Sequence, residues 1–264
     1  MRGFFLRAAA GSTLGFILLP LVLVTWLAFF RQEFPSFPPD GYSLRWFGAI
    51  LGNKSFVSGF VLSIEVALGA TAIGVALAMA ASQVVARARF WGRGGIETLL
   101  LLPLVVPGVV LGTSIYVFQI EAELATDWEI LGSTAGLVAA HVLIVIPWAV
   151  RLISASLIGL DMTVEEAAKN LGAGPWTTFR LVTLPAIRPG IVAGALFGFV
   201  TSFGNLEMSL FLVGPGRTTL PIAILQYLEW KIDPAVAAVS VLQILLIGAA
   251  MMITDRFVKL SNVV

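Results

Sequence analysis

The 264-residue sequence has no cysteine and only one histidine. The absence of cysteine excludes a disulfide framework, a thiolate metal site and a cysteine nucleophile. With His141 as the single histidine, most histidine-based catalysis is excluded, as is any zinc site that needs several imidazoles. We therefore expect the chain to have neither catalytic residues nor a metal site.

Charge is also scarce. Charged residues make up 12% of the sequence and hydrophobic residues 58%, whereas ordinary soluble domains have about 25% and about 45–50%. A water-soluble fold of this size would lack the polar residues to cover its surface. The same figures exclude disorder, a collagen-like chain and a coiled coil. A helical membrane protein remains.

Long apolar runs support this conclusion, because a helix needs about 20 apolar residues to cross a bilayer. The first run follows two arginines as a signal peptide does, but it is too long and lacks small residues for cleavage, so we expect a retained span. The sequence predicts an all-α polytopic membrane protein, with residues 1–264 forming a single transmembrane domain. The six predicted transmembrane helices cover about 8–30, 57–85, 98–120, 134–158, 187–212 and 235–256.

The basic residues indicate the orientation of these spans. Eleven of the sixteen lysines and arginines lie near the two termini, segments 86–97 and 159–186, or the adjoining span ends. Five lie on the opposite side. Because lysine and arginine concentrate on the cytoplasmic side, we expect both termini and the loop 159–186 to be cytoplasmic.

Two acidic residues, Glu65 and Glu207, fall inside predicted spans. A carboxylate in lipid is costly, so each should face the bundle interior or water. Both lie in the predicted outer half of the membrane with no intramembrane base nearby, which favours a cationic solute. We place Glu65, Glu207, Asn205 and Ser202 on a candidate solute pathway. The alternatives are hydrogen-bonded structural glutamates and an overlong span boundary.

Prolines mark the third and fourth predicted spans. Pro103 and Pro107 stand one turn apart and should bend the third span, because proline frees backbone carbonyls. Such a helix can line a pathway or pack closely, and the sequence leaves both open. Near Pro147 in the fourth span, His141 is expected to be a hydrogen-bonded packing residue rather than a ligand or proton relay.

The cytoplasmic loop 159–186 carries strong helix signals. Thr163 with Glu166 three residues later is a capping box that predicts a helix start. Gly172 should end that helix, and Pro175 should begin a second short helix that ends at Leu184–Pro185. The pattern predicts a helix–turn–helix on the inner membrane face. Its exposed aromatic side chains, Trp176 and Phe179, suit docking into a groove of another protein.

This loop resembles the signature loop of permease subunits of bacterial ABC importers, which reads Glu-Ala-Ala, three residues, Gly, nine residues, Ile, one residue, Leu-Pro. Here it is carried by Glu166, Ala167, Ala168, Gly172, Val182, Leu184 and Pro185, with valine in place of isoleucine. The resemblance implies a type I importer permease (MetI-like) fold, with the first short helix as the coupling helix. The residues that we expect to couple to the ATPase are Glu165, Glu166, Ala167, Ala168, Leu171, Gly172, Ala173, Pro175 and Trp176.

Further stretches resemble the second permease of the spermidine/putrescine transporter family. They are SLRW at 43–46, PLVVPGVVLG at 103–112 and the segment 202–240. The resemblance implies a polyamine such as putrescine or spermidine as the solute. Related branches carry 2-aminoethylphosphonate, 4-aminobutyrate, opines or ferric iron. The family often has an acidic residue at Gly204 or Asn205, where this chain is uncharged.

No P-loop motif occurs, so we expect no nucleotide site in the chain and no enzymatic activity of its own. The resemblance implies a second permease, so that a heterodimer forms, and an ABC ATPase dimer that binds ATP and Mg. It also implies a periplasmic solute-binding protein and a place in the bacterial inner membrane. The basic residues lie at span ends, where they meet lipid rather than nucleic acid. A self-sufficient secondary transporter and a membrane-embedded enzyme are the alternatives from other classes.

Overall fold

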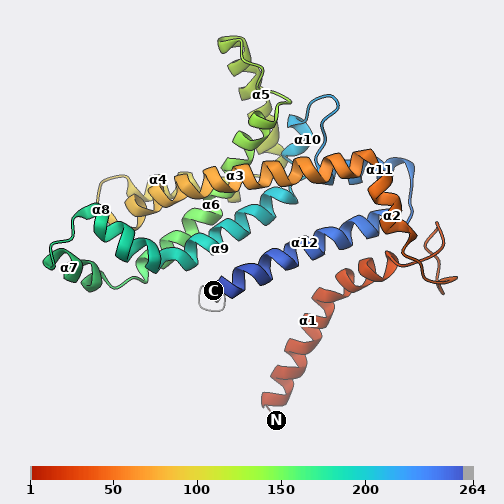
Figure 1. Cartoon of the computed structure of the whole chain (residues 1–264), viewed down its shortest axis with the longest axis horizontal. Helices are drawn as coiled ribbons and strands as arrows, with labels where there is room; N and C mark the ends of the chain where they lie inside the picture. The colour runs from red at the N-terminus through yellow and green to blue at the C-terminus, as the bar shows by residue number, and fades with distance from the viewer. Residues whose placement is uncertain (1, 258–264) are drawn as a thin grey trace. The chain divides into compact units, whose positions relative to one another are not determined.

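The computed structural model describes residues 2–257, with side chains from 6 to 256. Over this range, the regular secondary structure is entirely helical, apart from isolated bridges (Figure 1). The elements in chain order are α1 (Arg2–Leu27), α2 (Arg45–Gly52), α3 (Lys54–Arg87), α4 (Arg93–Leu101), the 3₁₀ helix η1 (Leu102–Leu104), α5 (Gly108–Thr126), α6 (Thr134–Ile158), α7 (Met162–Asn170), α8 (Pro175–Thr178), the π-helix η2 (Phe179–Thr183), α9 (Leu184–Phe203), α10 (Ser209–Leu212), α11 (Leu220–Trp230) and α12 (Ala235–Phe257).

Within the described part of the chain, five helices are long and apolar enough to cross a membrane, and a bent pair raises the number to six. This agrees with the predicted all-helical, polytopic class. The five are Leu6–Leu27, Lys54–Arg87, Thr134–Ile158, Pro175–Phe203 and Ala235–Arg256.

The third predicted span, 98–120, is not one helix. The bent pair Arg93–Leu104 and Gly108–Thr126 meets at an angle of 103°. Pro103 lies in η1, and Pro107 is the N-cap of α5 with extended ψ of 135°. Because proline lacks an N–H and restricts the residue before it, the two prolines turn the expected bend into a break.

The fifth predicted span, 187–212, also differs. The helix ends at Phe203, and residues 204–208 form turns before the short helix α10. Glu207 therefore stands in a connecting turn and not inside a helix. The apolar run continues past the helix end because Leu206, Met208 and Leu210 follow it, so hydrophobicity alone could not locate the boundary.

The chain divides into two compact units. The first combines residues 1–57 with 223–248. In it, the indole Nε1 of Trp46 on α2 donates a 2.7 Å hydrogen bond to the carbonyl of Phe30. Phe56 packs against Tyr227 of α11 with ring centroids 5.0 Å apart. These contacts fix the loop after α1 to α2 and the start of α3 to α11.

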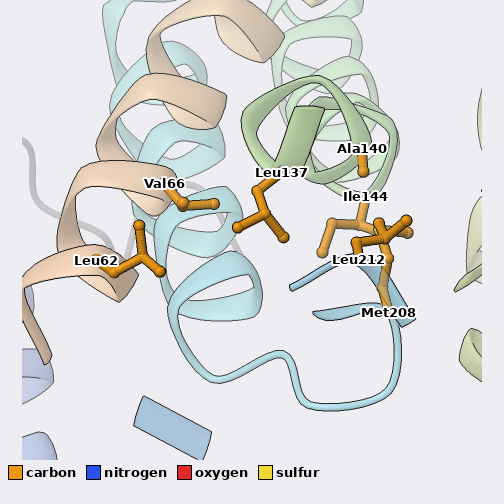
Figure 2. Close-up of a cluster of buried hydrophobic side chains, with 7 residues drawn as sticks. All are labelled: Leu62, Val66, Leu137, Ala140, Ile144, Met208 and Leu212. Carbon is orange, nitrogen blue, oxygen red and sulfur yellow. The ribbon is translucent and has the colours of Figure 1, made fainter. Parts of the chain in front are cut away.

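The second unit combines residues 58–222 with 249–264 and carries the sites predicted above. Its apolar core joins α3, α6 and the segment 208–212 (Figure 2). The core side chains are Leu62, Val66, Leu137, Ala140, Ile144, Met208 and Leu212. This cluster holds the turn after α9 against α6, and so it positions Glu207.

Helices α6 and α9 run side by side in the second unit (Figure 1). Gly190, Gly194 and Gly198 recur every four residues on the α9 face toward α6. A Cβ on Gly194 would lie 2.9 Å from the Cα of Ala149, and one on Gly198 would lie 2.7 Å from Val145 Cγ1. Small residues at this spacing let two backbones approach closely, which is how helices commonly pack in membranes.

Candidate coupling loop and solute pathway

The first helix of the loop, α7, begins two residues earlier than predicted. Its N-cap is Asp161, whose Oδ1 accepts a 2.9 Å hydrogen bond from the backbone N–H of Thr163. This bond holds the pKa of Asp161 below its ordinary value. The predicted capping box of Thr163 and Glu166 is wrong, because the aspartate two residues earlier already satisfies the free N–H.

The end of α7 is as predicted. Gly172 adopts the left-handed conformation, with φ of +88°. Its N–H donates to the carbonyl of Lys169 at 2.9 Å, and the N–H of Ala173 donates to that of Ala168 at 3.1 Å. This is a Schellman ending. No neighbour lies within 4 Å of a Cβ placed on Gly172, so the backbone conformation alone requires glycine.

The second helix begins as predicted and ends differently. Gly174 is the N-cap of α8 and Pro175 stands in its first turn. The predicted end at Leu184–Pro185 is wrong, because α8, η2 and α9 join into one span, Pro175–Phe203. The N–H of Leu184 reaches back five residues to the carbonyl of Phe179. This wider π-turn accommodates Pro185, which cannot donate a helical hydrogen bond.

Most of the predicted coupling residues share an exposed surface, which we name the coupling surface. Leu171 is 90% exposed and Trp176 is 70% exposed, with its indole stacked on Phe179 at 5.7 Å. Large apolar side chains this exposed at a loop mark an interaction surface. The coupling surface consists of Glu166, Ala167, Leu171, Gly172, Pro175 and Trp176, which are exposed, and Ala168 and Ala173, which are half-buried.

Glu165 lies apart from the coupling surface. Its side chain is buried. Arg87 Nη1, at the end of α3, donates a 2.9 Å hydrogen bond to one carboxylate oxygen, and Nη2 lies 2.8 Å from the other oxygen as an ion pair. Thr183 Oγ1 donates to the same carboxylate. Burial raises the pKa of Glu165, but the bonds from Arg87 and Thr183 outweigh it and keep the pKa below 4.5. The sequence reasoning missed Arg87 and Thr183, since no local pattern connects Glu165 to residues 78 and 18 positions away.

The two predicted pathway glutamates are both exposed on this chain, Glu65 on α3 and Glu207 in the turn before α10. Among the described residues, neither carboxylate has a hydrogen-bonding or ionic partner. The Glu207 side chain lies against Gly108, where a Cβ would collide with its carboxylate oxygen. Because Gly108 is the first residue of α5, the carboxylate stands near the positive end of that helix.

Ser202 and Asn205 have structural partners. Ser202 Oγ bonds to Nδ1 of His141 at 2.8 Å, and Asn205 Oδ1 accepts the backbone N–H of Met208 at 3.0 Å. His141 Nε2 lies 3.0 Å from Ser209 Oγ, which itself donates to the carbonyl of Asn205. His141 is thus the hydrogen-bonded packing residue that was expected. The network holds the turn that presents Glu207.

Comparisons with known proteins identify the family of the chain. Residues 70–262 match the family described as binding-protein-dependent transport system inner membrane component. The putrescine transport system permease protein PotI of Escherichia coli (strain K12) is 34% identical over 203 residues, covering 76% of this chain and 72% of the relative. The spermidine/putrescine transport system permease protein PotC of Haemophilus influenzae is 24% identical over 264 residues, covering 99% and 100%.

Solved structures share the fold. A bacterial ABC transporter involved in the import of the acidic polysaccharide alginate superposes with a TM-score of 0.72 at 12% identity, covering 97% of this chain and 95% of that one. The MetNI methionine ABC transporter gives 0.64 at 19% identity, covering 77% and 94%. The protein therefore belongs to the family of binding-protein-dependent transport system inner membrane components, as a multi-pass permease subunit of an ABC importer.

Proposed function

We propose that this permease moves a small organic cation, a polyamine such as putrescine or spermidine, into the cell. The observation that carries the proposal is the pair of carboxylates, Glu65 and Glu207, which have no basic partner in the described chain. An unpaired carboxylate in a membrane protein favours a cationic ligand over an anionic one. The relatives PotI and PotC are named for putrescine and spermidine.

The energy comes from outside the chain. We propose that an ABC ATPase dimer, which binds ATP and Mg, docks on the coupling surface, and that this chain itself hydrolyses nothing. A second, different permease completes the pathway, and a periplasmic binding protein delivers the solute. Both termini and the coupling surface then face the cytoplasm, as the basic residues favour. Closure of the ATPase dimer moves the coupling helices together and opens the pathway outward.

Uptake of labelled putrescine by the assembled transporter tests the solute. Replacing Glu207→Gln keeps the size of the side chain and removes its charge. Loss of one charge-assisted contact of about 1.5 kcal/mol lowers uptake about tenfold. Glu97→Gln, an exposed carboxylate on α4 outside the predicted pathway, is the control and should leave uptake unchanged.

The contrary results are also specific. Unchanged putrescine and spermidine uptake in Glu207→Gln would remove this residue from the pathway. Uptake of a molybdenum compound instead would favour the other kind of solute among the relatives, since the molybdenum transport system permease protein ModB of Haemophilus influenzae is 32% identical over 183 residues. That match covers 66% of this chain and 80% of the relative.

Co-purification of the ATPase tests the coupling surface. Leu171→Asp places a charge where an apolar side chain is proposed to enter the ATPase, so the complex should lose most of its ATPase. Trp91→Asp is the matched control, because Trp91 is 99% exposed in the loop between α3 and α4 and lies outside α7 and α8. If Leu171→Asp retained as much co-purified ATPase as Trp91→Asp, the assignment of the coupling surface would be contradicted.

A further inference from the structure

Glu165 is unusual among the side chains of α7. It is 3% exposed, whereas Val164 before it is 49% exposed and Glu166 after it is also exposed. It is the only buried residue of this helix, all nine residues of which the structure describes. α7 therefore has no fully buried apolar side chain to hold it against the rest of the second unit. The buried carboxylate of Glu165 makes this attachment instead.

The carboxylate connects three elements. Arg87, the last residue of α3, contacts both carboxylate oxygens. Thr183, the last residue of η2, donates to the oxygen that Arg87 Nη2 also approaches. The Arg87 side chain is 22% exposed and that of Glu165 is 5% exposed. A planar guanidinium that contacts both oxygens of a carboxylate restricts its orientation as well as its distance. A displacement of α7 therefore acts on α3 and on the start of α9 together.

The position of Thr183 adds to this connection. Thr183 closes the π-helix Phe179–Thr183, and Leu184 begins α9 directly after it. Single π-turns inside α-helices occur frequently at functional sites. Here the π-turn lies between the coupling surface and α9. The bond from Thr183 to Glu165 ties this irregular turn to α7.

We propose that Glu165 is a positioning residue that transmits the movement of α7 to α3 and α9 through Arg87 and Thr183. It acts through these two residues and does not contact the ATPase. Breaking the linkage while leaving the coupling surface intact should permit ATP hydrolysis with little transport. The proposal rests on the proposed function of α7 as the coupling helix.

Spin-label distances test the linkage without reference to the solute. The chain has no cysteine, so Lys169→Cys on α7 and Val84→Cys on α3, both exposed, can be labelled as a pair in the assembled transporter. With Glu165 present, we expect the label distance to be the same with and without a non-hydrolysable ATP analogue. With Glu165→Gln, the distribution of label distances should broaden or shift when the analogue binds.

Transport per ATP hydrolysed is the second readout, in proteoliposomes with putrescine as the probe. Glu165→Gln should keep hydrolysis within about twofold and lower uptake about tenfold, a coupling loss of about 1.4 kcal/mol. Arg87→Lys, which keeps the charge and loses the planar guanidinium that contacts both carboxylate oxygens, should give values between those of Glu165→Gln and the unaltered protein. Glu97→Gln is the control. If the unaltered protein does not transport putrescine, the solute assignment is wrong. The spin-label distances then test the linkage through Glu165 by themselves.

Several results would overturn the proposal. One is a distance distribution that Glu165→Gln leaves unchanged in both states. Another is uptake and hydrolysis that fall in parallel per assembled complex. If Glu165→Gln does not assemble, Arg87→Lys and Thr183→Val are judged by the same measures, and failure of all three to assemble would show that the linkage serves folding alone. Failure of α7 as the coupling helix would appear separately, as ATPase retained by Leu171→Asp.

Discussion

Buried polar side chains hold this membrane protein together at a few positions, and His141 is one of them. Ser209 Oγ donates to the carbonyl of Asn205, so it accepts a hydrogen from His141 Nε2. Nδ1 then has a free lone pair and accepts from Ser202. A neutral imidazole protonated at Nε2 therefore satisfies both serines. The network ties α6 to both ends of the turn that presents Glu207.

Replacing His141→Leu should lower the stability of the assembled complex by about 1–2 kcal/mol, because the buried Ser202 hydroxyl loses its partner. Thermal unfolding of the detergent-solubilised complex measures the change. The double variant His141→Leu with Ser202→Ala should regain part of the loss. Thr113→Val, which removes a hydroxyl bonded only within its own helix, is the control. A midpoint shift equal to the control would contradict this role for His141.

The ionised form of Glu165 stabilises the fold, because its pKa is held below the ordinary value of 4.5. A carboxyl with a lowered pKa contributes stability above its unfolded pKa and loses it as the pH falls through the lowered value. The difference in unfolding midpoint between the unaltered complex and Glu165→Gln should therefore stay constant from pH 7.5 to about 5.5. It should shrink below about 4.5. A difference that shrinks already near neutral pH would mean that this carboxyl titrates at a raised pKa.

At the scale of elements, the contact of α6 and α9 depends on glycine. Gly194→Ala forces a methyl group to within 2.9 Å of the Cα of Ala149, and a backbone atom cannot move aside as a flexible side chain can. We expect the overpacked variant to lose about 1–3 kcal/mol, read from its unfolding midpoint. Gly95→Ala in α4 meets no atom within 4 Å and should be neutral or slightly stabilising. Equal midpoints for the two variants would show that the helices can separate at no cost.

Local signals predicted one helix end and one helix start in the loop 159–186 correctly. Gly172 and Pro175 determine a helix end and a helix start through backbone conformation, which depends on neighbouring residues alone. The same local reasoning failed at Thr163, because Asp161 is a competing cap. It failed again at Leu184–Pro185, because a π-turn accommodates the proline and lets the helix continue.

At the scale of the whole molecule, the expected orientation can be measured directly. The chain lacks cysteine, so Trp128→Cys in the loop between α5 and α6 and Trp91→Cys between α3 and α4 have no background from this subunit. A maleimide that does not cross membranes should label Trp128→Cys on cells whose inner membrane is intact. Trp91→Cys should react only after the inner membrane is permeabilised. The reverse pattern would invert the proposed topology and place the coupling surface outside.

The sequence by itself determined the class of this protein, the approximate spans, and the helix end at Gly172 and helix start at Pro175 in the loop 159–186. These follow from composition and from patterns within about thirty residues, where apolar length and turn chemistry act locally. Only the tertiary structure decided the place of Glu207 outside α9 and the contacts of the buried Glu165 carboxylate. Each depends on groups distant in the sequence, such as Arg87 for Glu165 and Ser202 for His141. No local pattern records which of several polar side chains will meet once the helices have packed.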